Sequence, residues 1–146
     1  MPYLGSSPST TPPAQPSQGA LEAETDEDSY VTPDLIRFSP GVAKAWINFT
    51  GTGTPSVNAS YNVSSLTDNA TGDFTVNFDD DFSGANNYTA SGFAYNGAGT
   101  SEVMAPTVTT SEAAPAAGAF RFACVFVGGE SNSDRQKFAL AFHGYQ

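Results

Sequence analysis

Few residues in this chain have side chains that commonly perform catalysis. His143 is the only histidine in the sequence, so a Ser-His-Asp or Cys-His arrangement would have to use it, and no G-x-S-x-G nucleophile motif occurs. Cys124 is the only cysteine, and it lies in an apolar segment that predicts a strand. We therefore interpret His143 as a surface residue at the end of a strand, and we expect no enzymatic activity.

Carboxylates are concentrated in two places. The run Asp79, Asp80 and Asp81 follows a predicted strand, where it could offer oxygens to a hard cation or a carboxylate pair for glycoside hydrolysis. Because neighbouring side chains on a strand point in alternate directions, we interpret this run as a solvated turn, with a structural Ca²⁺ site as the minor alternative. The acidic residues between positions 22 and 28 lack the order of an EF-hand loop, so we interpret them as solvated charge.

Two glycine-rich segments, TGTGT at 50–54 and NGAGT at 96–100, resemble phosphate-binding loops in composition. Neither opens a helix that begins with Lys-Ser or Lys-Thr, and no βαβ pattern surrounds them. We interpret both segments as turns, and the sequence predicts no cofactor.

The overall charge limits the partners of the chain. Its formal net charge is −10, from 15 acidic and 5 basic residues, so binding to a phosphate backbone, which relies on clustered Lys and Arg, is not expected. The same charge disfavours an anionic membrane surface, and no apolar run approaches the roughly 20 residues that span a bilayer. The N-terminal residues MPYLGSSPST lack the basic and apolar regions of a secretory signal. We therefore predict neither a nucleic-acid nor a membrane partner, and we expect synthesis in the cytoplasm.

Strand patterns separated by turn signals fill the chain after residue 42. Ala45, Ile47 and Phe49 recur at alternate positions, which gives the first strand one apolar face. Pro106 marks an edge strand, because proline cannot donate a ladder hydrogen bond. The expected strands are 43–49, 57–64, 73–78, 88–95, 103–110, 119–127 and 137–143, with turns that include 50–55 and 68–72. The pattern predicts an all-β fold, an antiparallel β-sandwich of jelly-roll-like type with about seven strands.

The expected strand at 119–127 is apolar on both faces. Alternation divides its apolar residues into two sets, namely Phe120, Phe122, Cys124 and Phe126 on one face and Ala123, Val125 and Val127 on the other. One face can line the domain core, and the other can form a surface between subunits of an oligomer. The alternative is a central strand buried inside a two-sheet sandwich, and the sequence leaves both open. Trp46 likewise has two interpretations, core or oligomer interface.

Several aromatic residues on the expected strands lie beside Asn and Ser, a combination that suits sugar binding. Tyr61, Tyr88 and Tyr95 are candidate contacts for a glycan, with Trp46 as a further one. The alternative is that these side chains complete a core or an interface, and we favour that alternative for Trp46.

The first 30 residues differ in composition from the rest of the chain. They hold five of the ten prolines and five carboxylates but no basic residue, so they cannot bury enough apolar surface to fold alone. We interpret residues 1–30 as an extended arm that becomes ordered by binding a neighbouring protein, with Tyr3 and Leu4 as anchors. The alternative is a flexible terminus without a partner.

Residues 31–42 predict a short helical linker between this arm and a β module at 43–146. Thr32 can cap a helix, Pro33 suits its first position, and Asp34 complements its dipole. Three apolar side chains of the linker are expected to pack on the following module or on a symmetry-related copy: Leu35, Ile36 and Phe38.

Two parts of the sequence resemble bacteriophage fibre-type structural proteins, including tail fibres. The words KAWINF, ASYNVSS, TDN and TGDFTVNF, between residues 44 and 78, resemble a β module of that family in order and spacing. Upstream, LEAETDEDSYVTPDLIRFSPG is similar to the E-A-x-T-D-x-x-x-Y-V-T-P-x-x-L segment that joins domains in many phage tail fibres. Together these stretches cover residues 21–78.

The resemblance implies a non-enzymatic virion protein, such as a short fibre, spike-base, adaptor or head-decoration subunit. It implies attachment to capsid, collar or tail proteins, assembly as a homo-oligomer, usually a trimer in phage fibres, and location in the virion after synthesis in the host cytoplasm. The chain ends at Gln146, without the long shaft or large receptor-binding head of a full tail fibre, so host recognition is not implied by the family alone. The alternative from another class is a lectin-like module that recognises host surface polysaccharide.

Overall fold

The computed structural model describes residues 14–23, 25, 30–33, 35–95, 104–107, 114–126 and 132–146. The chain divides into two compact units, Met1–Ser39 and Pro40–Gln146. Several residues that the sequence singled out lie outside the described residues, namely Tyr3, Leu4, Asp34, Val127, the segment at 96–100 and most of the acidic residues between positions 22 and 28.

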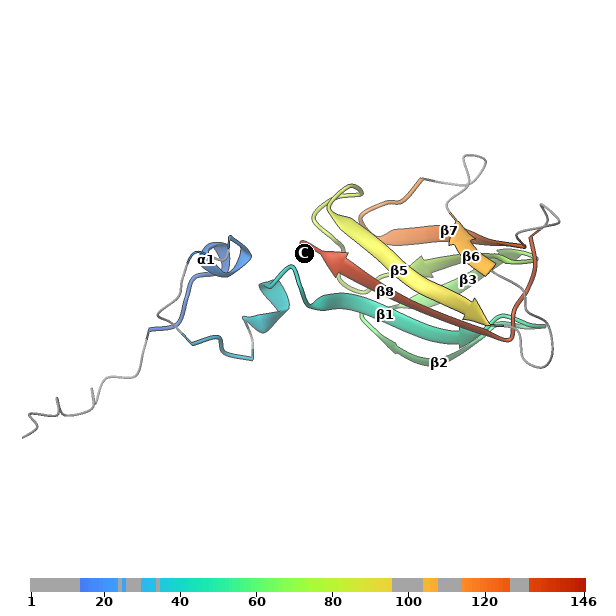
Figure 1. Cartoon of the computed structure of the whole chain (residues 1–146), viewed down its shortest axis with the longest axis horizontal. Coiled ribbons are helices and arrows are strands. Elements are labelled where there is room, and N and C mark those ends of the chain that lie inside the picture. Colours follow the sequence, from blue (N-terminus) through green and yellow to red (C-terminus); the bar gives the residue numbers. More distant parts are fainter. Residues whose placement is uncertain are drawn as a thin grey trace, which may run out of the picture. The chain divides into compact units, whose positions relative to one another are not determined.

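Eight strands in the described part of the second unit form two four-stranded sheets, in which every pairing is antiparallel (Figure 1). Sheet A has the order β2 (Ser56–Tyr61), β1 (Ala43–Thr50), β8 (Lys137–Gly144) and β5 (Tyr88–Tyr95). Sheet B has the order β3 (Ser65–Ala70), β4 (Asp73–Asn77), β7 (Ala119–Phe126) and β6 (Met104–Thr107). The predicted all-β antiparallel sandwich is confirmed.

Each half of the chain supplies two adjacent strands to each sheet. The first half contributes β1 and β2 to sheet A and β3 and β4 to sheet B, and the second half contributes β5 and β8 to sheet A and β6 and β7 to sheet B. The halves join where β1 pairs with β8 and where β4 pairs with β7. Pro106 lies on β6, at an edge of sheet B, as its missing N–H predicts.

Phenylalanine dominates the core between the sheets. The alternation predicted for β1 is confirmed, because Ala45, Ile47 and Phe49 are all buried. The ring of Phe49 stacks on Phe138 of the same sheet at a centroid distance of 4.7 Å and meets the edge of Phe74 from sheet B at 5.1 Å. Each fully buried phenylalanine stabilises the fold by about 1.5–3 kcal/mol relative to exposure, so these rings hold the two sheets together.

The structure corrects two predictions about strand boundaries. Residues 68–70 were expected in a turn, but they belong to β3, and the turn is confined to Thr71 and Gly72, where Gly72 has a φ of +67°. The amide of Asn69 donates to Thr75 on β4 at 2.9 Å, so polar side chains hold this hairpin together. The strand expected at 57–64 ends at Tyr61, because Asn62 has a φ of +52° and bonds the backbone N–H of Asp80 at 2.6 Å. The result is eight strands rather than seven.

The first unit has helical turns at two places. Helix α1 (Gln18–Glu22) is capped by Ser17, whose hydroxyl accepts from the Ala20 N–H at 3.1 Å, so the arm predicted as extended is helical there. A 3-10 helix, η1 (Ile36–Phe38), confirms a turn in the linker. The Leu35 N–H, just before this helix, donates to the backbone carbonyl of Thr32 at 3.0 Å. No side chain caps the helix, so the predicted cap by the Thr32 hydroxyl is wrong.

Apolar residues around η1 differ in burial. Leu35 is buried and Phe38 is half-buried beneath the Arg37 guanidinium, which lies 4.8 Å from its ring centroid. Ile36 is 51% exposed, and the predicted packing of these side chains on the β module or on another copy stays a prediction.

Candidate functional site

The two groups that sequence analysis considered for nucleophilic chemistry lie on different sheets. Cys124 is fully buried on β7 of sheet B, and burial raises the pKa of its thiol to about 11, which keeps it protonated at neutral pH. His143 lies on β8 of sheet A, between Ala43 and Thr89, and is half-buried. A buried, protonated thiol is a poor nucleophile, so Cys124 acts as a core residue.

The Asp79–Asp81 run lies at the surface, with all three residues exposed. The backbone carbonyl of Asp80 accepts from Asn62 at 3.1 Å and from Gln146 at 3.0 Å, so this segment is fixed by its main chain. Among the described residues, no group of three or more His, Cys, Asp or Glu side chains is arranged to hold a metal ion.

The charged pair Asp73 and Arg121 lies on the outward side of sheet B and was not predicted. Arg121 donates from Nε to Asp73 at 2.9 Å and from Nη2 at 2.5 Å, and Asn69 donates to the same carboxylate at 3.2 Å. The bidentate geometry neutralises a carboxylate whose side chain is only 4% exposed. Its partners are supplied by the chain itself, which identifies the pair as structural.

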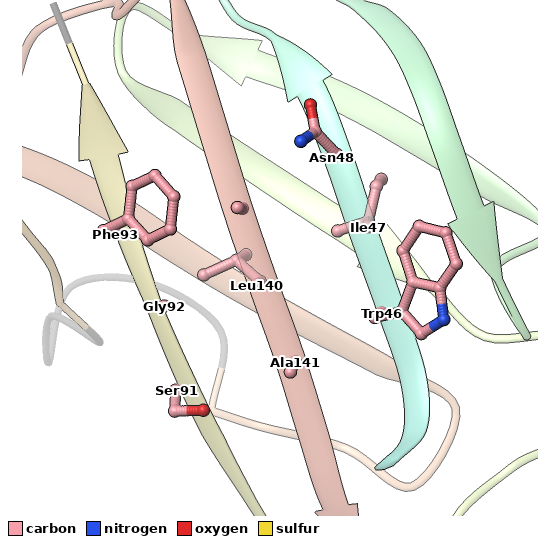
Figure 2. Close-up of a pocket in the computed structure, with 9 residues that line it drawn as sticks. Trp46, Ile47, Asn48, Ser91, Gly92, Phe93, Leu140 and Ala141 are labelled. Carbon is pink, nitrogen blue, oxygen red and sulfur yellow. The ribbon is translucent and has the colours of Figure 1, made fainter.

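The outer face of sheet A contains a trough between Trp46 on β1 and Phe93 on β5. Figure 2 shows Trp46 and Phe93 on either side of β8. Ala139 and Ala141 of β8 form the floor of the trough. The trough is open, encloses about 420 Å³, and is lined by Trp46, Ile47, Asn48, Ser91, Gly92, Phe93, Ala139, Leu140 and Ala141.

Strand register explains the trough. One row across the sheet aligns Trp46 with Ala141 and Ser91, and the next outward-facing row aligns Asn48 with Ala139 and Phe93. Large side chains therefore lie on β1 and β5, and alanine lies at both positions of the central strand between them. Since a methyl group projects little above the sheet, the space between the rings stays open.

Two further aromatic residues extend this surface. Tyr61 on β2 is directly opposite Trp46, and Tyr95 is the next outward residue after Phe93 on β5. The exposed fractions are 53% for Tyr61, 39% for Trp46, 56% for Phe93 and 55% for Tyr95. We call these four residues the aromatic strip.

The sequence predictions for these aromatics have mixed outcomes. Tyr61 and Tyr95 lie at the surface, as a binding role requires, and Trp46 is not a core residue. Phe93 was missed, although it alternates in phase with Tyr95 on one strand, which was a usable signal.

Tyr88 is half-buried and packs against the core, so it does not share the outer face of sheet A with the other candidate glycan contacts. Its ring stacks on Phe82 at 4.4 Å and meets Phe78 and Phe142 edge-on. Its hydroxyl lies 3.1 Å from the carbonyl of Ala116, to which it donates. Burial raises the pKa of Tyr88 to about 12. Tyr88 and Tyr95 are an odd number of positions apart on β5, and they consequently point to opposite faces.

Polar groups border the trough. Asn58 donates to the side-chain oxygen of Asn48 at 3.2 Å and lies 3.4 Å from the Thr50 hydroxyl, which fixes the Asn48 amide. Ser91 lies on the opposite side, on β5. The four strands of sheet A contain no Asp or Glu, although the chain has 15 acidic residues. The strands of this sheet therefore bring no carboxylate to the trough.

Residues on β7 favour the core alternative over the oligomer interface. Phe120 and Phe122 are buried, and Ala123 on the opposite face is fully buried. Ser133 N–H donates to the Cys124 carbonyl at 3.0 Å, which ties a following segment of the same chain to β7. Val125 is half-buried, and the side chain of Phe126 lies outside the described part.

Comparison with protein-family models, with curated proteins and with solved structures found no match for this chain. In the parts of the chain that the structure describes, no helix has the length and apolar character needed to cross a membrane. The fold and the exposed surface together define an all-β sandwich with a candidate binding face on sheet A.

Proposed function

We propose that this chain is a non-enzymatic structural protein of a phage virion, which attaches through its N-terminal segment and oligomerises through its β-sandwich. The sequence words that resemble phage fibre proteins supply β1 to β4, which are half of each sheet. The resemblance therefore concerns elements of the framework rather than a surface loop.

The observation that carries this proposal is the apolar surface of the first unit. Tyr30, Val31 and Ile36 are 49%, 43% and 51% exposed, next to a helix of three residues. The helices in the described part of this unit are short, and exposed apolar side chains gain stability when another protein covers them.

Deletion of residues 1–30 tests the attachment role. We expect the truncated chain to remain a folded oligomer of unchanged stoichiometry, measured by light scattering, and to be absent from particles assembled in infected cells. Ile36→Ser in the full chain should weaken incorporation, while Tyr145→Ser, at an exposed position of the sandwich, should not. Normal incorporation of the truncated chain would contradict the proposal.

A second candidate is a receptor-binding module that recognises host surface polysaccharide. The observation that favours it is the aromatic strip beside an uncharged trough, because concave sites that combine aromatic walls with a few polar groups are typical of ligand binding. Binding of the purified full-length chain to host cells would support this role, and a pure scaffold would not bind them.

A further inference from the structure

We propose that the trough and the aromatic strip bind an uncharged, linear polysaccharide, with sugar rings lying against Trp46 and Phe93. This inference rests on the receptor-binding candidate and names its ligand class and its site. The apolar C–H face of a pyranose ring packs on an aromatic face, while the hydroxyl groups at the ring edge need hydrogen-bonding partners. The trough offers both kinds of group on one surface.

The aromatic residues are placed for a chain rather than for a single sugar. Trp46 and Phe93 lie on strands separated by β8, which puts their backbones roughly 10 Å apart across the sheet. They also lie in successive outward rows, with Tyr61 beside Trp46 in its own row and Tyr95 one row beyond Phe93 on β5. The strip therefore crosses sheet A diagonally, with the alanine floor in the middle.

The polar groups at the trough suit hydroxyl recognition. The Asn48 side chain is held by Asn58, so its amide is oriented before a ligand arrives. Ser91 provides a hydroxyl on the far side of the trough, in the row of Trp46. An amide and a hydroxyl can each donate and accept, which matches the mixed character of sugar hydroxyl groups.

Charge indicates a neutral ligand. None of the nine lining residues is ionisable, and the lysines beside the strip on its own strands are Lys137, opposite Tyr95, and the buried Lys44, two positions before Trp46. The chain as a whole carries a formal charge of −10, which repels a polyanion at long range. A neutral polysaccharide avoids this repulsion, and it brings no charged group into a trough that has no charged lining residue to pair with it.

The composition of the trough favours a glycan over a second copy of the chain. Interfaces between proteins are enriched in aromatic residues but depleted in Ala and Ser, and Ala139, Ala141 and Ser91 make up much of this surface. A flat floor of small residues between two rings accommodates a flat ligand.

The only tryptophan of the chain lies in the proposed site, so its fluorescence reports binding directly. The full-length protein is titrated with dextran, laminarin, galactomannan and soluble chitin oligosaccharides, with polygalacturonate as the anionic comparison. We expect a saturable change in Trp46 emission with at least one neutral polymer and none with polygalacturonate. No response to any neutral polymer would overturn the proposal.

Two variants locate the site while keeping the fluorescent reporter. Phe93→Ala should weaken binding about tenfold, as expected for loss of a central aromatic contact. Ala139→Leu should fill the trough and weaken binding although every aromatic residue remains. The matched control is Tyr145→Ala, which removes an exposed aromatic residue outside the strip and should bind normally. Binding that is unchanged in both Phe93→Ala and Ala139→Leu would overturn the site.

The oligomeric state of the same variants separates a glycan site from a self-association surface. We expect Phe93→Ala and wild type to have the same mass by light scattering. A fall in mass for Phe93→Ala would identify the face as an interface between copies and would overturn this inference. Particle incorporation, tested with the deletion of residues 1–30, is independent of these readouts, so the two proposals fail separately.

Discussion

The outer faces of the two sheets are built in opposite ways. On sheet B, polar side chains bond to one another across the strands, since Asn77 donates to Ser65 at 2.9 Å and to Thr67 at 3.2 Å, and Asp73 is paired with Arg121. On sheet A, the outward side chains include four exposed aromatic residues around an alanine floor. One face satisfies its own polar groups, and the other leaves apolar surface in contact with solvent.

This difference does not come from topology. Each half of the chain contributes two adjacent strands to both sheets, and each sheet buries one face against the same phenylalanine core. The two sheets differ in the residues at outward positions, where packing imposes few requirements. Outward residues are therefore the place where a function can be added to this framework, and sheet A is the face on which we propose a binding site.

The largest expected effect is on sheet B. Arg121→Ala would leave the Asp73 carboxylate buried without its guanidinium, which should lower the free energy of unfolding by about 3 kcal/mol. Lys137→Ala, on sheet A, should change it by less than about 0.5 kcal/mol. Urea unfolding of both variants provides the comparison. Equal effects would mean that the ion pair does not stabilise its face.

Alkaline pH should distinguish the inward from the outward tyrosine of β5. Burial raises the pKa of Tyr88 from 10.0 to about 12, so between these values the unfolded chain releases a proton that the folded chain retains. Stability from this residue is complete below pH 10.0 and declines as the pH rises towards about 12. Tyr88→Phe should flatten this decline in urea unfolding, and Tyr95→Phe should not. An equal decline in both variants would contradict the assignment.

The smallest expected effect on stability is at the aromatic strip. Phe93→Ser removes a side chain that is 56% exposed, so the free energy of unfolding should change by less than about 0.5 kcal/mol. Urea unfolding beside wild type measures this. A loss of 2 kcal/mol or more would assign Phe93 to the framework and remove the contrast between the two faces.

Strand alternation predicted much of the framework. It identified β5 at 88–95 with both of its ends, the buried face of β1 and the edge position of Pro106. It missed β3, because Leu66 is the only large apolar residue in that strand and its pairing depends on side-chain hydrogen bonds with β4. Polar strands of this kind have no hydrophobic period to detect.

The proposed binding face was only partly predictable. The tyrosines could be proposed as surface residues from the Asn and Ser residues beside them in the sequence. Trp46 and Phe93, however, are 47 positions apart, and they flank one trough only because β1 and β5 both pair with β8. Alternation along β5 could have shown that Tyr88 and Tyr95 point to opposite faces and that Phe93 shares the face of Tyr95. The alanine floor could not be predicted from the sequence, because Ala139 and Ala141 form a floor only when larger side chains on β1 and β5 lie on both sides of them.

The strand order has a consequence for how the protein is made. β8 is the last described strand along the chain, and it occupies a central position in sheet A between β1 and β5. Until the ribosome has released it, Ile47 and Phe49 have no neighbouring strand on that side, and the aromatic trough has no floor. Folding of this sheet is thus completed only after β8 has left the ribosome, and a change that removes β8 would affect both halves of the molecule at once.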